Sequence, residues 1–169
     1  MKLIGNKEEF AVQYEITDKQ NWMGYSKVWF GDNPIGTDED IIYIKGYLIK
    51  GLEKIGNSYD IDMDYDYEKE TLFKKLEQRL KNSNDDQIRK YLVIFGTFCD
   101  DFTIFSFLIE DEINIIWKLN SNDTPFTDLS NLDLSVNHFK IKKTSYLEKL
   151  RAIKLGMFPD GAGTQLSEV

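Results

Sequence analysis

The sequence of 169 residues has few of the side chains that usually carry chemistry. It contains one cysteine, Cys99, and one histidine, His138. A lone cysteine cannot form an internal disulfide, and one Cys with one His cannot complete the ligand shell of a zinc site. Glycine-rich phosphate-binding loops and the Gly-x-Ser-x-Gly motif are also missing from the sequence. We therefore expect no enzyme activity, no catalytic residue, no cofactor and no bound metal.

The sequence also lacks a long hydrophobic run and an excess of positive charge. No stretch approaches the ~18 apolar residues of a transmembrane helix, and the segment Met1–Phe10 turns polar too early for a secretory signal. We therefore expect a cytoplasmic protein. Lys and Arg number 21 against 29 Asp and Glu, which gives a net charge of -8. This balance argues against nucleic acid and anionic membranes as partners and favours a basic protein partner.

Apolar residues are nevertheless abundant enough for a folded core. They make up 41% of the sequence, with 14% aromatic residues. A chain of this length buries roughly 70% of its unfolded surface on folding. We expect one domain over residues 1–156, followed by a flexible C-terminal tail over residues 157–169, where the sequence becomes small and polar.

Alternating and continuous apolar patterns predict several strands. In residues 9–16, for example, Phe10, Val12 and Tyr14 share one side of an extended chain. Residues 102–109 are almost entirely apolar, so this strand is expected to be covered on both faces. Because the turns are short, consecutive strands should pair antiparallel. The expected strands are residues 9–16, 23–30, 91–98, 102–109, 113–119 and 136–142.

Apolar residues at spacings of three and four predict helices over residues 37–55, 69–81 and 145–155. Thr37 would cap the first, and Ser145 with Glu148 has the capping-box pattern of the third. Consecutive strands separated by helices indicate an α+β fold. We expect an antiparallel sheet of five to six strands with two to three helices packed on it.

One segment, residues 59–67, has an unusual pattern with a period of two. Four aspartates, Asp60, Asp62, Asp64 and Asp66, alternate with Tyr59, Ile61, Met63, Tyr65 and Tyr67. In a strand the carboxylates would lie about 6.6 Å apart on one side. Neighbouring charges would repel by roughly 0.6 to 2.5 kcal/mol per pair, which a basic partner would relieve. The segment is also typical of an edge strand whose charged face prevents edge-to-edge pairing.

The same aspartates leave metal binding open as a third interpretation. An EF-hand loop that starts at Asp60 needs Gly at its sixth position and Glu at its twelfth, but Tyr65 and Thr71 stand there. The calcium motif therefore fails, although oxygen ligands could still hold magnesium or calcium for a metal-assisted hydrolase that uses Asp60, Asp62 and Asp64.

About the first 36 residues of the sequence resemble a known family. The segments Ile4–Glu15 (Ile-Gly-Asn-Lys-Glu-Glu-Phe-Ala-Val-Gln-Tyr-Glu), Met23–Trp29 (Met-Gly-Tyr-Ser-Lys-Val-Trp) and Pro34-Ile35-Gly36 are similar to the opening of immunity protein family 42 of bacterial polymorphic toxin systems. Near the C-terminus, Gly156-Met157-Phe158-Pro159 is also similar. No catalytic residues are implied by this resemblance.

The resemblance implies a small cytoplasmic protein that binds and neutralises one cognate toxin. If that toxin is a nuclease or another basic domain, an acidic surface would be the natural contact. The candidate partner-binding residues are then Asp60, Asp62, Asp64, Asp66, Tyr65 and Tyr67, with Tyr59 as a further aromatic anchor. The metal-assisted hydrolase and a general interaction module without a toxin are the alternatives.

Overall fold

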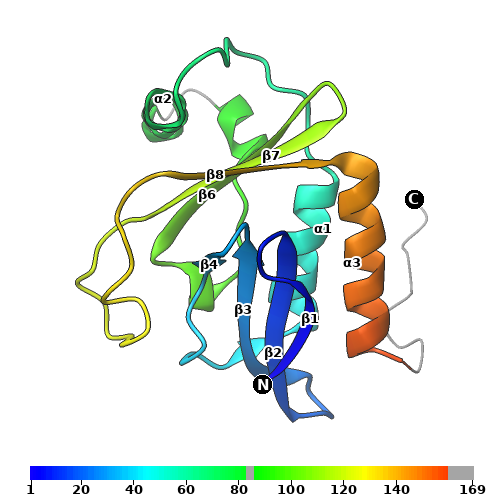
Figure 1. The fold of residues 1–169 in the computed structure, drawn as a ribbon. Coiled ribbons are helices and arrows are strands. Elements are labelled where there is room, and N and C mark those ends of the chain that lie inside the picture. The colour runs from blue at the N-terminus through cyan, green and yellow to red at the C-terminus, as the bar shows by residue number, and fades with distance from the viewer. Residues whose placement is uncertain (83–85, 160–169) are drawn as a thin grey trace.

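The chain folds into an α+β structure with two antiparallel sheets, as seen in a computed structural model that describes residues 1–82 and 86–159 (Figure 1). The first sheet contains β1 (Lys2–Asn6), β2 (Phe10–Asp18), β3 (Met23–Phe30), β4 (Asn33–Ile35) and β5 (Ile42–Tyr43). Its order is β1-β2-β3-β4, and β5 also pairs with β3. The second sheet contains β6 (Phe102–Ile109), β7 (Glu112–Leu119) and β8 (Asn137–Lys142), paired in that order.

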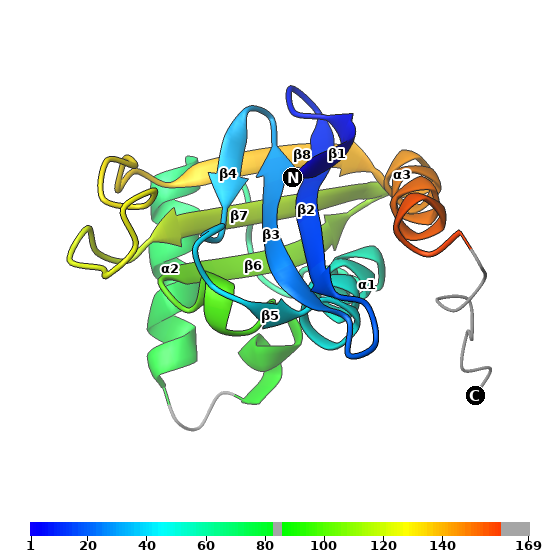
Figure 2. The ribbon, with the colours of Figure 1, turned by 90° about the horizontal axis from the view of Figure 1, so that it is seen from below.

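A π-helical turn, η1 (Lys45–Ile49), leads directly into α1 (Lys50–Gly56), and the longer helices are α2 (Lys69–Lys81) and α3 (Lys143–Met157). Helices α1 and α3 pack on the core between the two sheets, and α2 packs on the other face of the second sheet. Short 3-10 turns, η2 (Asp86–Lys90) and η3 (Thr97–Cys99), flank the segment that leads into β6. Figure 2 shows the strands of the second sheet running across those of the first, with α1 and α3 together at one side.

The main core fills the space between the two sheets and under α1 and α3. Phe10 stacks on both Phe30 and Tyr146, with ring centroids 5.0 Å apart in each pair. The buried Tyr146 hydroxyl donates a hydrogen bond to the Leu52 carbonyl at 2.9 Å, which joins α3 to α1. Stacked aromatic rings of this kind stabilise a core beyond the area that they bury.

A second core covers the opposite face of the second sheet. Helix α2 contributes Leu72, Phe73 and Leu76, which pack with Phe105 and Phe107 of β6. The prediction that residues 102–109 are covered on both faces is therefore confirmed. The α+β class is also confirmed, but the strands divide between two sheets, because β6 and β7 bury one face against the first sheet and the other under α2.

Several local predictions differ from the structure. Residues 37–44 do not begin a helix; they contain β5, and the helical turns start only at Lys45. Residues 91–98 do not form a full strand, although Val93 donates a backbone hydrogen bond to Ile104 of β6 at 2.9 Å. Helix α3 begins at Lys143 with no side-chain cap, so Ser145 and Glu148 lie inside it and form no capping box at its start.

At the C-terminal end the core continues past the expected domain boundary. Met157 and Phe158, placed in the expected tail, are buried in the main core. Residues 160–169 of that tail lie outside the described residues, as do residues 83–85 of the expected turn after α2.

Candidate functional site

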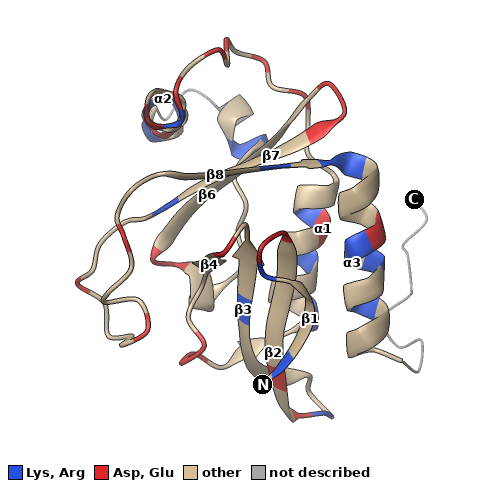
Figure 3. Ribbon diagram, viewed as in Figure 1, with Lys and Arg blue, Asp and Glu red and all other residues tan. Residues whose placement is uncertain are grey.

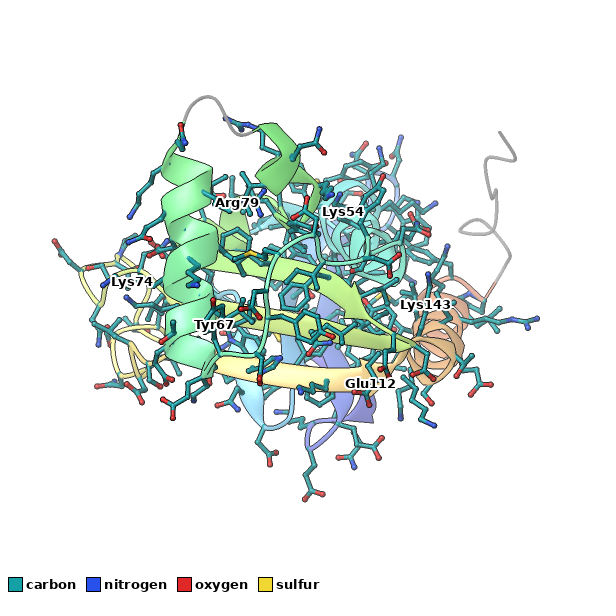
Figure 4. The ribbon with its side chains drawn as sticks, turned by 90° about the horizontal axis from the view of Figure 1, so that it is seen from above. Lys54, Tyr67, Lys74, Arg79, Glu112 and Lys143 are labelled. Carbon is teal, nitrogen blue, oxygen red and sulfur yellow. The ribbon has the colours of Figure 1, made fainter. Side chains whose placement is uncertain are left out.

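The acidic segment 59–67 crosses over the second sheet as an irregular chain between α1 and α2, not as the predicted strand (Figure 4). Only its start pairs with a strand: Leu108 donates to the Tyr59 carbonyl at 2.8 Å, and Ile61 donates to the Leu108 carbonyl at 3.0 Å. The hydroxyl of buried Tyr91 then donates to the Asp60 carbonyl and accepts from the Asp62 amide, both at 2.9 Å. The backbone of residues 59–62 is therefore held in place without regular secondary structure.

Asp62 is bound within the fold itself. Its carboxylate accepts hydrogen bonds from Arg79 of α2 and from Lys90 of η2, each at 3.0 Å. Desolvation raises the pKa of Asp62, but the hydrogen bonds from Arg79, Lys90 and Tyr91 outweigh it, and the pKa lies below its ordinary value. Asp62 therefore links the segment to two other elements, so it is less available to a partner than the sequence pattern suggested.

The alternation of the segment survives as a difference in burial. Ile61, Met63 and Tyr67 are half-buried against the second core. The ammonium of Lys75 on α2 lies 3.5 Å from the centroid of the Tyr67 ring, a cation–π contact. Tyr67, a candidate anchor from sequence, is thus used within the fold, and Figure 4 shows it beside α2.

The remaining candidate residues face solvent. The side chains of Asp60, Asp64 and Asp66 are exposed, and Tyr59 and Tyr65 are 55% and 44% exposed. Among the described residues, Asp60 and Asp66 form no side-chain ion pair. The hydrogen bond from the Asp66 backbone amide has the largest effect on the pKa of Asp64, and the hydrogen bond from the Tyr67 side chain has the next largest. Both lower this pKa, so the carboxylate stays charged at neutral pH.

A neighbouring turn extends this negative surface. The turn between β6 and β7 exposes Glu110, two residues beyond the Leu108 position that pairs with Asp60. Figure 3 shows the acidic segment and this turn at the same end of the molecule. We call the exposed carboxylates of Asp60, Asp64, Asp66 and Glu110 the acidic surface. Glu110 was not among the candidate residues, because its proximity depends on the pairing of segment 59–61 with β6.

The acidic residues Asp38 and Glu39 form contacts within the fold. Asp38 and Asp128 both pair with the nearly buried Lys27, at 3.5 and 2.5 Å. Desolvation raises the pKa of Asp128, but hydrogen bonds from Lys27 and Thr37 dominate and lower it. Glu39 accepts hydrogen bonds from the backbone amides of residues 127 and 128. These contacts hold the loop after β7 against the first sheet, so the carboxylates of Asp38 and Glu39 are bound within the fold.

The described part of the chain contains no candidate metal cluster. There, no three His, Cys, Asp or Glu side chains are arranged to hold a metal ion. Asp62 faces two cationic side chains, which is the opposite of a shared cation site with Asp60 and Asp64. The carboxylate set that the hydrolase alternative requires is therefore not brought together.

Cys99 and His138 are also apart in the fold. Cys99 packs in the main core, where burial raises its pKa well above the ordinary value. His138 Nε2 lies 3.0 Å from Asn114 Oδ1 on the sheet face under α2, and burial lowers its pKa to about 4. A buried neutral thiol and an imidazole bound elsewhere do not form a nucleophile–base pair.

None of the helices in residues 1–82 and 86–159 combines the length and the hydrophobicity that a bilayer-spanning helix needs.

Comparison with known proteins decides the family. The profile of the family described as Immunity protein 42 matches residues 1–154, which is most of the chain. The chain belongs to the immunity protein 42 family. The resemblance in the N-terminal segments is therefore confirmed, and the match also covers the middle of the chain, outside those similar segments. No curated protein matches the chain.

A solved structure shares the fold. The crystal structure of CdiI from Burkholderia dolosa AUO158 is similar with a TM-score of 0.59 and 13% sequence identity, and the match covers 90% of this chain and 97% of that chain. At this identity the likeness shows a common fold. Membership of the immunity protein 42 family identifies the chain as a toxin-neutralising immunity protein.

Proposed function

We propose that this immunity protein neutralises its cognate toxin by stoichiometric docking through the acidic surface, without turnover of its own. The toxin domain would be basic, as nuclease-type domains are, and the complex would form in the cytoplasm. The observation that carries the proposal is a group of four exposed carboxylates, of which Asp60 stands on backbone that β6 and Tyr91 hold in place.

The arrangement favours fast and specific association. Clustered like charges focus a field that can raise association rates to ~10⁸–10⁹ M⁻¹s⁻¹ at low salt. The backbone of residues 59–62 is fixed by its hydrogen bonds, which reduces the entropy that is lost when this part of the contact forms. Tyr59 and Tyr65 are exposed beside the carboxylates and would supply the rigid aromatic contacts that are enriched at interface hot spots.

Co-purification with the toxin encoded by the neighbouring gene tests this proposal. Tagged immunity protein should recover that toxin domain, titration calorimetry should give one toxin per chain, and co-expression should rescue cells from the toxin. Complete neutralisation of the toxin by much less than one equivalent of immunity protein, or toxin that is chemically altered after incubation, would contradict stoichiometric inhibition. Failure of both binding and rescue would refute the pairing with that toxin.

A further inference from the structure

Strand β8 forms an open edge of the second sheet, as Figure 2 shows. It pairs with β7 in a continuous antiparallel register in which Lys142 lies opposite Glu112. The backbone N–H of Lys143 donates to the Asp111 carbonyl at 2.9 Å, so the backbone groups of the odd-numbered residues of β8 point towards β7. The groups that point out of the sheet are the N–H of His138, Lys140 and Lys142 and the carbonyls of His138 and Lys140. Within residues 1–82 and 86–159 none of these outward groups has a hydrogen-bond partner.

The opposite edge of the same sheet is closed by the chain itself. Ile104 of β6 accepts a backbone hydrogen bond from Val93 at 2.9 Å, and Ser106 donates one to the Tyr91 carbonyl at 2.8 Å. Leu108 exchanges two more with the acidic segment, at 2.8 and 3.0 Å. The fold therefore uses the outer backbone of β6 and leaves that of β8 available to an added strand.

The first sheet protects its edges in a different way. Strand β4 has three residues and contains Pro34, which has no N–H to donate. Strand β1 contains Gly5 at φ +98°, outside the conformation of a regular strand. In β8, by contrast, six residues without Pro or Gly pair in regular register, and Lys140 and Lys142 are exposed. The edge of β8 is thus guarded by charge and not by its backbone.

This charge selects the kind of strand that can pair with β8. Lysines on an edge repel another strand that carries lysines, so pairing of β8 with a second copy of itself is disfavoured. The same lysines attract a strand with Asp or Glu at alternating positions. On the other side of β8, Phe139 and Ile141 are half-buried against the main core and would contact the residues between them. The edge is therefore complementary to an extended segment that alternates acidic and apolar side chains.

From the open backbone and its lysines we infer that β8 receives an extended acidic segment of the toxin as a fourth strand of the second sheet. Main-chain hydrogen bonds would supply affinity, and Lys140 with Lys142 would select the segment. The inference rests on the proposed function and adds a second contact to it. Because Lys142 lies opposite Glu112, two residues from Glu110 of the acidic surface, one toxin domain can reach both contacts.

Amide hydrogen exchange measured by NMR tests the added strand directly. In the free protein the outward amides of Lys140 and Lys142 should exchange fast, whereas the amides of Phe139 and Ile141, which point towards β7, should be protected. Binding of the purified toxin domain should slow exchange at Lys140 and Lys142 by about 100-fold or more. Unchanged exchange at these two amides in the complex would overturn the inference, while stoichiometric inhibition would stand.

Two edge variants separate the backbone contact from the charge. Lys140→Pro removes an outward N–H without removing a donor to β7, and the double variant Lys140→Glu with Lys142→Glu reverses the charge. Each should weaken toxin binding by about ten-fold or more. The control, Lys2→Glu with Lys19→Glu, makes the same change of charge at exposed lysines away from β8 and should stay within about two-fold. The charge-reversed variant keeps the test informative if Lys140→Pro fails to fold.

The possible results separate the inference from the proposed function. If the toxin binds the unchanged protein and both edge variants equally well, β8 is not a contact, although the inhibitor role stands. If the toxin does not bind the unchanged protein, the proposed function fails and the inference fails with it. Protection of the Lys140 amide that rises with protein concentration in the absence of toxin, together with a dimer in sedimentation experiments, would assign β8 to a second copy and overturn the inference.

Discussion

Replacing Asp62 should reduce stability and leave toxin association largely unchanged, although Asp62 stands in the middle of the acidic segment. Its carboxylate joins Arg79 of α2 and Lys90 of η2 at 3.0 Å each. Asp62→Asn removes both ion pairs at once. Because the Asp62 side chain is 37% exposed, each pair is screened by water and contributes at the level of surface pairs.

The expected loss is about 1–2 kcal/mol in the free energy of unfolding, which lowers the melting temperature by about 2–8 °C in a domain of this size. Urea and thermal unfolding at pH 7 measure it directly. Asp66→Asn is the matched control, since Asp66 has no ion-pair partner among the described residues, and it should change stability by less than about 0.5 kcal/mol.

The pH dependence supplies a second check with a definite sign. The pKa of Asp62 is lowered in the folded state, so its contribution is present above the ordinary value of 3.8 and is lost as pH falls through the folded pKa. The difference in free energy of unfolding between the unchanged protein and Asp62→Asn should therefore be full at pH 7 and should disappear once the pH is below the folded-state pKa of Asp62. Equal unfolding curves at pH 7 would refute the assignment of Asp62 to the fold.

Three further predictions concern the cores and the buried polar groups. Leu76→Ala, in fully buried contact between α2 and the second sheet, should destabilise the protein by about 2–5 kcal/mol in urea unfolding, and a smaller loss would indicate that α2 packs loosely. Asp128→Ala leaves the nearly buried Lys27 with only the longer contact to Asp38, so the free energy of unfolding should fall by about 2 kcal/mol or more. Adding Lys27→Met to Asp128→Ala should recover part of that loss, and no recovery would contradict the pairing. Burial lowers the pKa of His138 to about 4, so NMR titration should show a neutral ring at pH 5.5. The free energy of unfolding should fall as pH drops from about 6.5 towards 4, because the unfolded state takes up the proton first. A folded-state pKa above 6 would refute the burial of His138 next to Asn114.

The elements that could be predicted from sequence are those whose signal is local. The hairpins β2–β3 and β6–β7 and helix α2 follow from apolar periodicity within each segment. Strand β1 was missed because most of its side chains are exposed, and β5 has only two residues. The first predicted helix began too early because Thr37 and the acidic residues after it bind the loop after β7, as the hydrogen bond from Thr37 to Asp128 shows.

The acidic segment shows where local pattern stops being sufficient. Its alternation correctly separated half-buried Ile61 and Met63 from exposed Asp60 and Asp64. It predicted a strand wrongly, because residues 91–93 already occupy the β6 edge next to the Leu108 pairing. Likewise, the partners of Asp62 lie 17 and 28 residues away in sequence, so its internal role could be seen only in the folded structure.

The salt dependence of toxin association tests the central claim most directly. Stopped-flow measurements with the purified toxin domain would compare the unchanged protein, the double variant Asp60→Asn with Asp66→Asn, and a control of equal charge, Asp123→Asn with Glu148→Gln. The account predicts that the acidic-surface variant associates several-fold more slowly at low salt and depends less on ionic strength, whereas the control stays close to the unchanged protein. Equal association rates for both double variants would show that net charge, and not the acidic surface, guides the toxin, and would contradict the account.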